Sequence, residues 1–314
     1  MGRLGFIGKR LLVLIPLLAG IVLVVFLLLK VTPGDPARQA IGLRASPAQV
    51  VEARARMGLD KPVAAQYVSY LGHAVRGDLG YSYKSRSPVL GTMGRRAPVT
   101  LWLIGAGTVF SLLIAVPLAV VAALRRDRLA DHAVRGFSVF GLAMPMFWVG
   151  IMLITLVALP TGWFPVGGFG GSLADRLRAI VLPGLTLGVA MAPVLIRSLR
   201  TTIIEALESD YVDAARSLGV SGTRPVRRFV LRNALPSTVT LLAVQSGYFL
   251  FGAVVLETTF ALPGMGQGIV QAAVQRDFPL VQGYTLVLAV CVVLVYLLAD
   301  VVTALLDPRV VIEA

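Results

Sequence analysis

Few side chains in this sequence have the type and spacing that enzyme chemistry requires. His73 has no cysteine, aspartate or second histidine at ligand spacing, His132 stands alone in a basic loop, and the single cysteine, Cys291, lies in an apolar run. The sequence contains no nucleotide-binding G-x-x-x-x-G-K-[ST] loop and no G-x-S-x-G nucleophile elbow. We therefore expect no catalytic residue, no metal site and no bound cofactor, and any energy that is used must come from another chain.

Ionisable residues are scarce within the apolar runs of the sequence. Asp300 lies about one helical turn from the end of the last run, and Glu257 lies at the end of the fifth. Transporters that couple to protons or ions usually carry such groups near the middle of the membrane. The scarcity argues against an ion-coupled secondary transporter, which stays open as the alternative function. A structural scaffold without transport activity is a third possibility.

Prolines and one amide side chain interrupt the apolar runs. Pro145, Pro193 and Gln245 are candidates for a translocation pathway, because broken helices leave backbone groups that a cavity or a neighbour must satisfy. Each could equally produce a simple kink. Small residues also recur at four-residue intervals at Gly184, Gly188 and Ala192, which predicts close approach of a second helix rather than chemistry.

The composition predicts that membrane helices carry these residues. Hydrophobic residues make up 57% of the chain and charged residues 14%, and the mean hydropathy is +0.83, whereas soluble domains carry about a quarter charged residues. A membrane-spanning helix needs about 20 apolar residues. Six segments meet this length, which predicts an all-α integral membrane protein: 11–29, 98–124, 137–160, 179–196, 236–256 and 284–306.

The net charge of +13 does not indicate nucleic-acid binding, because the basic residues lie between apolar runs and not on one face of a soluble fold. Their distribution is informative about membrane topology instead. No nucleic-acid partner is expected, and membrane lipid is. Lysine and arginine counted over the short loops place both termini in the cytoplasm. The first apolar segment is longer than the core of a secretory signal and has no small-residue cleavage pattern after it, so we expect it to be retained.

Residues 31–97 form a long segment between the first two spans, and we expect it outside the cell as a small helical region. Ser46 and Gln49 have capping-box spacing, with Pro47 in the first turn, so a helix is predicted to about Met57. A second helix is predicted from about Pro62 to near Gly77. The region suits a lid on the membrane surface, and a docking surface for an acidic partner is compatible with that lid.

A cytoplasmic loop over residues 201–235 interrupts the apolar pattern. The stretch "EALESDYVDAARSLG" is predicted to be one helical run, with acidic residues early and Gly219 in position to end it in left-handed geometry. A second helix carries the arginines of "TRPVRRFVLRNALP". From these residues alone, the loop could dock on another protein, or its arginines could only enforce topology and contact anionic lipid.

Several motifs resemble one family of transport proteins. "DAARSLG" resembles the E-A-A-x-x-x-G core of the coupling loop in permease subunits of ABC importers, with Asp213 in place of glutamate and the closing Leu235 and Pro236 a few residues later than in the general motif. The later closure is similar to the dipeptide/oligopeptide/nickel branch. "TPGDPA", "YLGHAVRGDLGYSY", "ETTFALPGMGQ" and "ALLDPR" are similar to the same branch, so the resemblance runs over nearly the whole chain.

The resemblance implies a type I importer permease with six transmembrane helices in the cell inner membrane. It implies a second homologous permease, two ABC ATPase subunits that use ATP and Mg, and an extracytoplasmic substrate-binding protein. Di- or oligopeptides are the implied substrates, although similar permeases carry nickel complexes, glutathione or sugars. The implied ATPase-coupling residues are Asp213, Ala214, Ala215, Arg216, Leu218 and Gly219.

Three regions follow from these expectations. Residues 1–30 hold the N-terminus and the first helix, and residues 31–97 form the extracytoplasmic helical region. Residues 98–314 form the permease core, which contains the coupling loop 201–235.

Overall fold

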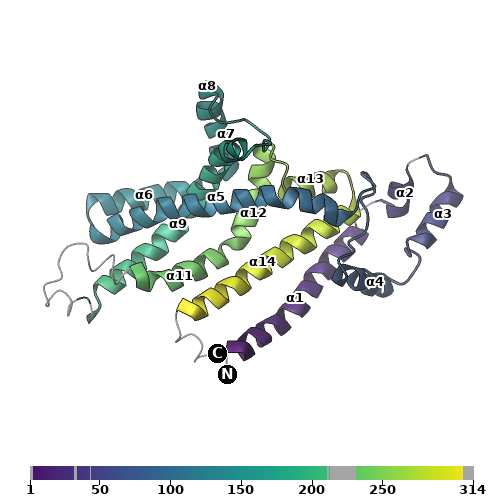
Figure 1. The fold of residues 1–314 in the computed structure, drawn as a ribbon, viewed down its shortest axis with the longest axis horizontal. Coiled ribbons are helices and arrows are strands. Elements are labelled where there is room, and N and C mark those ends of the chain that lie inside the picture. The colour runs from purple at the N-terminus through teal and green to yellow at the C-terminus, as the bar shows by residue number, and fades with distance from the viewer. Residues whose placement is uncertain (1–2, 32–33, 43, 211, 213–230, 307–314) are drawn as a thin grey trace. The chain divides into compact units, whose positions relative to one another are not determined.

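The computed structural model (Figure 1) describes residues 3–31, 34–42, 44–210, 212 and 231–306, and most of these residues are helical. These residues contain no β-strand, only an isolated antiparallel bridge between Tyr81 and Pro88. The helices are α1 (Arg3–Val31), α2 (Pro36–Ile41), α3 (Pro47–Arg56), α4 (Val63–Val75), α5 (Val89–Leu124), α6 (Leu129–Ala143), α7 (Met146–Leu153), a π-helical turn (Ile154–Ala158), α8 (Leu159–Thr161), α9 (Leu173–Leu207), α11 (Leu231–Val244), α12 (Ser246–Thr259), α13 (Met265–Val274) and α14 (Phe278–Leu306).

The apolar helices confirm the predicted all-α membrane class. In the part of the chain that the structure describes, three helices are long and apolar enough to cross a membrane without interruption, namely α5, α9 and α14. Two further bent pairs of helices meet the test together, and α1 contains the shorter apolar stretch Ile15–Leu28. Each predicted segment thus falls on helical structure, while the count of six spans stays a prediction.

The third predicted segment, 137–160, is not one continuous helix. It is divided between α6 and the helical stretch Met146–Thr161, which begins with α7, and the two parts differ in direction by 98°. Met144 is extended, with φ −81° and ψ 127°, because a residue before proline is disfavoured in helical geometry, and Pro145 follows at the start of α7. Of the two interpretations left open for Pro145, a break in the helix is therefore observed.

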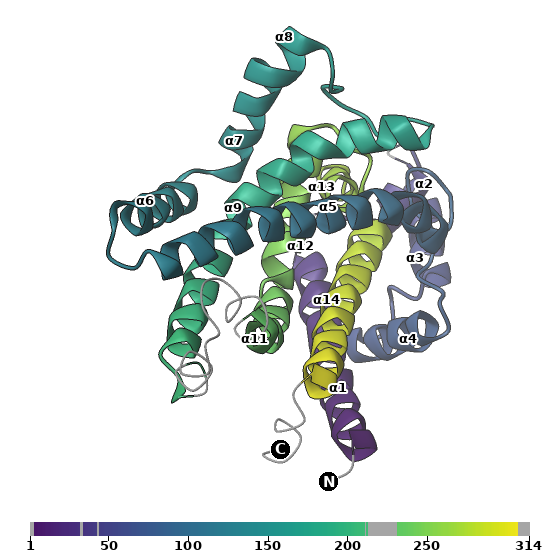
Figure 2. The same cartoon turned by 60° about the vertical axis from the view of Figure 1, so that its left-hand side comes forward.

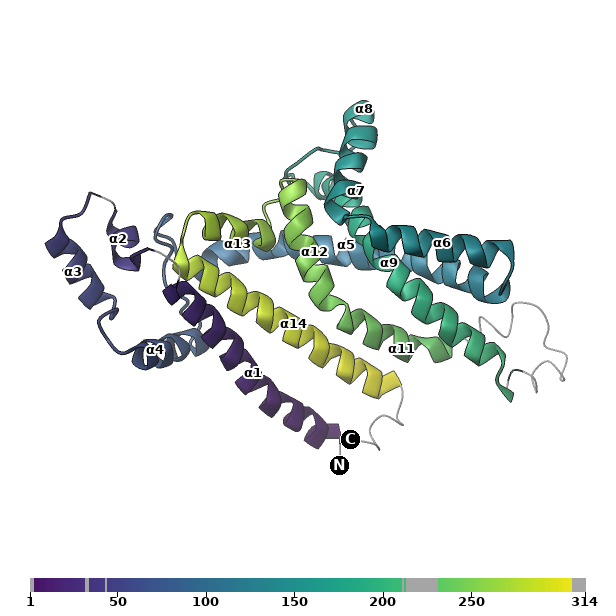
Figure 3. The same cartoon turned by 180° about the vertical axis from the view of Figure 1, so that it is seen from behind.

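The fifth predicted segment, 236–256, is also broken. Gln245 separates α11 from α12, and the parts Thr238–Val244 and Gly247–Thr259 differ in direction by 53°. Figure 3 shows α12 leaving α11 at this bend. No proline stands at the break, but Ser246 and Gly247 follow Gln245 directly, and a serine–glycine pair is a common site of a helix kink.

The described residues divide into two compact units, and the first contains 100–262 together with both chain ends. In this unit α9 packs against α6, α7, α11 and α12 (Figure 2). Alanines of α5, such as Ala115 and Ala119, are fully buried beside larger residues of α9, such as Leu195 and Ile203. Small residues on one helix against branched residues on the other let two long helices lie close together.

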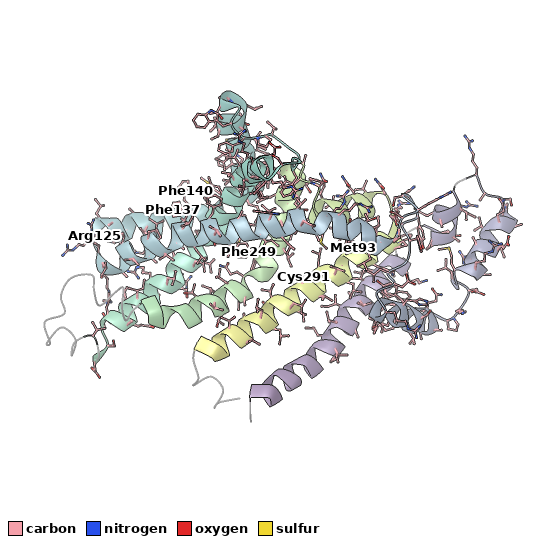
Figure 4. All side chains as sticks on the ribbon, in the orientation of Figure 1. Met93, Arg125, Phe137, Phe140, Phe249 and Cys291 are labelled. Carbon is pink, nitrogen blue, oxygen red and sulfur yellow. The ribbon has the colours of Figure 1, made fainter. Side chains whose placement is uncertain are left out.

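Aromatic residues of α6 remain exposed in this unit. Phe137 and Phe140 lie along α6, and Arg125 lies just after the last residue of α5 (Figure 4). The exposed apolar surface suits lipid or a second membrane subunit rather than water.

The second unit contains residues 7–99 and 263–294. Its short helices confirm the local signals of the sequence: Ser46 caps α3, its Oγ accepts from the Gln49 N–H at 3.3 Å, and the Gln49 side chain accepts from the Ser46 N–H at 2.8 Å. Gly58 follows α3 with φ +65°. The predicted second helix is α4. The division of the chain at residues 30 and 97 stays a prediction.

A buried carboxylate fastens a loop within the second unit. Asp277 is fully buried and accepts from the Ser82 hydroxyl at 2.5 Å and from the N–H groups of Tyr83 and Lys84, each at 3.2 Å. Burial, reinforced by the Asp277 charge, raises the pKa of Tyr83 to about 12. This contact was not predictable from the sequence, because its partners are almost two hundred residues apart.

The helical run predicted over 205–219 is interrupted near its start. α9 ends at Leu207, and Glu208 and Ser209 form a turn before helical geometry resumes at Asp210. The Ser209 hydroxyl donates to the Ala206 carbonyl at 2.5 Å, so this side chain satisfies a carbonyl that helix continuation would otherwise use. The prediction of one continuous helix was therefore wrong at this point.

Candidate coupling and translocation site

The predicted ATPase-coupling residues lie outside the described part of the chain. Asp213, Ala214, Ala215, Arg216, Leu218 and Gly219 all belong to residues 213–230. The structure does describe α9, which leads to them in the sequence, and α11, which follows them. The end of α9 at Leu207 is the helix end that precedes these residues in the sequence.

A buried ion pair joins α6 to α9 near that end. Asp131 is fully buried and accepts from Nε and Nη2 of Arg200, both at 2.7 Å, through its two oxygens. Arg135 at 3.1 Å and the N–H of Asp127 at 3.0 Å also donate to it. Such a two-pronged guanidinium–carboxylate contact fixes both direction and distance. It ties the last turns of α9 to the start of α6.

Sequence reasoning missed this pair. Arg200 served only as a basic residue for topology, and Asp131 was not considered. The sole available signal was an acidic residue in an otherwise basic loop, between Arg128 and Arg135.

The crossing of α5 and α9 confirms the close approach that the small-residue interval predicted. A Cβ added at Gly184 would lie 2.7 Å from the Ala106 Cβ, and one added at Gly188 would lie 2.5 Å from the Phe110 Cβ. Ala192, the third member of the interval, is fully buried in the core of the first unit. Only glycine fits at the first two positions with the two helices this close.

Leu187 fills a gap where α5, α9 and α12 meet. It is fully buried, and a Cβ added at Gly107 or Gly252 would come within 2.5 or 2.6 Å of its methyl carbons. The leucine of one helix therefore enters the space that two other helices leave by having glycine. Sequence reasoning did not identify this three-helix junction.

Pro193 packs against the broken third segment. It is buried inside α9, and a Cβ added at Gly141 of α6 would lie 2.9 Å from its Cγ. Gly141 lies just before the break at Pro145. The structure thus brings Pro193 close to the α6–α7 break, and a pathway role for either proline stays a prediction.

Gln245 is the candidate pathway residue with an unsatisfied group. Its side chain is only 4% exposed, and its Nε2 has no hydrogen-bond partner among the described residues. A buried donor without a partner is costly and rare in native structures, so such a group needs an explanation.

Replacing Gln245 with leucine should separate a packing role from a transport role. The change removes the unpartnered donor, so we expect unchanged or slightly higher thermal stability of the purified protein. If the amide faces the transported molecule, the uptake rate should fall by about tenfold, which corresponds to one lost hydrogen bond of about 1.4 kcal/mol. Equal loss of stability and uptake would instead assign Gln245 to packing alone.

A second buried carboxylate joins α5 to α12. Glu257 is fully buried, and the Thr100 hydroxyl donates to it at 2.6 Å. The residue was expected at the outer end of a span, and the structure shows it engaged in a helix-to-helix contact. Within the described residues, no group of three histidine, cysteine, aspartate or glutamate side chains could hold a metal ion.

Broken helices, small-residue crossings and buried interhelical polar pairs are typical of membrane proteins with several packed spans. The family described as "Binding-protein-dependent transport system inner membrane component" matches residues 115–312, and its N-terminal counterpart matches residues 3–104. The chain therefore belongs to this family, the permease subunits of ABC importers, which confirms the resemblance of its motifs.

Individual relatives cover nearly the whole chain. It is 37% identical to the di/tripeptide transport system permease protein DppB of Pseudomonas aeruginosa (strain UCBPP-PA14), over 98% of both chains. It is also 37% identical to the glutathione transport system permease protein GsiC of Escherichia coli (strain K12), over 98% of this chain and 99% of that one.

A solved structure supports the fold. A chain of the MetNI methionine ABC transporter in an inward-facing conformation matches with a TM-score of 0.55 and 19% identity, over 69% of this chain and 97% of that chain. At this identity the likeness concerns the fold.

Proposed function

We propose that this permease forms half of the translocation pathway of an ATP-driven importer for di- or oligopeptides. The observation that carries the proposal is its identity of 37% over nearly the full chain to a di/tripeptide permease, together with equal identity to a glutathione permease. Glutathione is itself a tripeptide, so both relatives indicate small peptides with a free carboxylate. The chain itself catalyses no reaction, and Gln245, Pro145 and Pro193 are its candidate pathway residues.

The importer would contain a second homologous permease, two ATPase subunits that use ATP and Mg, and an extracytoplasmic binding protein. Both termini would be cytoplasmic, so the end of α9 and the Asp131–Arg200 pair would face the ATPases. Closure of the ATPase pair would move the coupling residues from Asp213 to Gly219, and α9 would carry this movement into the bundle. The Asp131–Arg200 ion pair would transmit the movement of α9 to α6.

Uptake by the purified complex in liposomes tests this function directly. Labelled dialanine should accumulate when ATP is supplied to the ATPase side, and unlabelled peptides should compete with it. Uptake that follows an ion gradient without ATP would instead support a secondary transporter. Competition by glutathione but not by dialanine would correct the substrate within the same class of importer.

Replacing Gly219 with valine should uncouple ATP hydrolysis from transport. The sequence predicts left-handed geometry there, where a side chain with a Cβ costs about 1–2 kcal/mol. We expect uptake per ATP hydrolysed to fall by roughly tenfold, the factor equivalent to that cost. The measurement is uptake and ATP hydrolysis in the same proteoliposomes.

The matched control is Gly219→Asn, because asparagine tolerates left-handed geometry. It should keep most of the wild-type coupling. If Gly219→Val shows normal uptake and normal stimulation of hydrolysis by the binding protein, the coupling role of this glycine is wrong.

A further inference from the structure

The second unit contains a hollow of about 990 Å³ whose wall is rich in positive charge. We call it the basic hollow and define it by its four cationic side chains, Arg38, Arg44, Lys84 and Arg276. All four residues are exposed, and none of them forms an ion pair with a described acidic residue. Four unpaired cations around one hollow repel one another, so an anion bound there would be stabilised.

The carboxylates nearby are already engaged. Asp35, which also lines the hollow, pairs with Arg54 at 3.1 Å and accepts from the Ala37 N–H at 3.1 Å. Asp277 is fully buried under its contacts to Ser82 and the following backbone. The hollow therefore keeps an excess of positive charge that these two groups leave uncompensated.

Backbone features hold the cations of the hollow in place. The Asp277 carboxylate accepts from the Lys84 N–H and fixes this residue beside the α13–α14 turn. Arg276 adopts φ +55° in that turn, and its Nη1 lies 4.0 Å from where a Cβ would stand at Gly34. The Arg276 guanidinium therefore lies within contact distance of the segment that carries Arg38.

Chain connectivity places the basic hollow at the membrane surface. Gly34 follows closely after Val31, the last residue of α1, and Arg276 stands shortly before Phe278, the first residue of the apolar helix α14. A residue spans at most about 3.5 Å, so Gly34 and Arg276 in the wall of the hollow each lie within roughly 10 Å of a membrane helix end. The headgroup layer on each side of a bilayer is about 5–7 Å thick.

We propose that the basic hollow binds the phosphate headgroup of an anionic phospholipid. Arginine guanidinium groups suit phosphate oxygens because they donate two parallel hydrogen bonds. The closeness of the hollow to two membrane-helix ends favours a lipid headgroup over the acidic face of a soluble protein, which would have to reach into the headgroup layer. The bound lipid would anchor the short helices α2 and α3 to the membrane surface, whatever substrate the permease carries.

Lipid retention tests the proposal. The purified complex is placed in nanodiscs of phosphatidylcholine with phosphatidylglycerol, extracted, and analysed by native mass spectrometry for bound phosphatidylglycerol. In the variant Arg38→Gln/Arg276→Gln, retention should weaken by roughly tenfold or more, since each cation near the surface strengthens anionic lipid binding several-fold. The variant Arg38→Lys/Arg276→Lys keeps the two charges, and the amount of phosphatidylglycerol that it retains should lie between those of the wild type and the glutamine variant.

The matched control is Arg76→Gln/Arg95→Gln, which removes two exposed cations of the same unit outside the hollow. It should retain lipid like the wild type. Equal retention by all variants would overturn the proposal. The proposal would also be overturned if Arg38→Gln/Arg276→Gln retained lipid normally but ATP hydrolysis were no longer stimulated by the binding protein, because the hollow would then be a protein docking surface. Displacement of the lipid by inorganic phosphate at equal concentration would overturn it as well.

The measurement of lipid retention does not depend on transport activity. A failed uptake assay with normal lipid binding would therefore contradict only the proposed function.

Discussion

Replacing Gly188 with leucine is expected to disrupt the packing of α5 on α9 and to abolish transport. The first added carbon would already lie 2.5 Å from the Phe110 Cβ and 2.9 Å from the Ser111 backbone nitrogen. The backbone cannot move aside as a flexible side chain could, so the two helices must separate. Overpacking of this kind costs about 1–3 kcal/mol and sometimes more.

Thermal unfolding of the detergent-purified protein and ATP-driven uptake measure this effect. Gly105→Leu is the matched control, because Gly105 lies on α5 with no atom within 4 Å of an added Cβ. That variant should keep both stability and uptake. A Gly188→Leu protein as stable as the control would show that the two helices are not held this close in the membrane.

Replacing Asp131 with alanine should destabilise the protein by about 3–5 kcal/mol, the usual cost of leaving one partner of a buried ion pair alone. Arg200 would keep its charge with a side chain only 19% exposed. Arg135 would also lose a partner, but its side chain is about half exposed and water can solvate it. We expect poor assembly with the other subunits, measured by co-purification and thermal unfolding.

Two variants control this experiment. Arg126→Gln breaks an exposed ion pair with Glu208 and should change the unfolding free energy by less than about 1 kcal/mol. The double variant Asp131→Leu/Arg200→Met removes both charges, so stability should largely return. If the double variant folds well yet uncouples ATP hydrolysis from uptake, the pair transmits movement, whereas normal coupling would restrict it to stability.

Local signals made much of the helical structure predictable from the sequence. The capping box of Ser46 and Gln49 and the glycine after it set the bounds of α3. The long apolar runs located the membrane helices, because a span needs uninterrupted apolar length. The four-residue spacing of Gly184 and Gly188 predicted a close crossing, although the partner helix could not be named.

Contacts between distant residues were not predictable in this way. Asp131 pairs with Arg200 across 69 positions, and no periodicity or cap connects them. The size of the 98° break at Pro145 was not predictable either, since a proline indicates a kink or a break but not its angle. The ATPase-coupling site was predicted only from the resemblance of its motif to a family, and the roles of its residues stay predictions.

The position of Leu187 has a consequence for how this sequence can change over generations. Because Gly107 and Gly252 both make room for the leucine, a larger residue at either glycine requires a smaller one at position 187 at the same time. The three positions are therefore expected to change together, because a single substitution at one of them leaves the three-helix junction badly packed. Gly105, with open space around it, carries no such constraint.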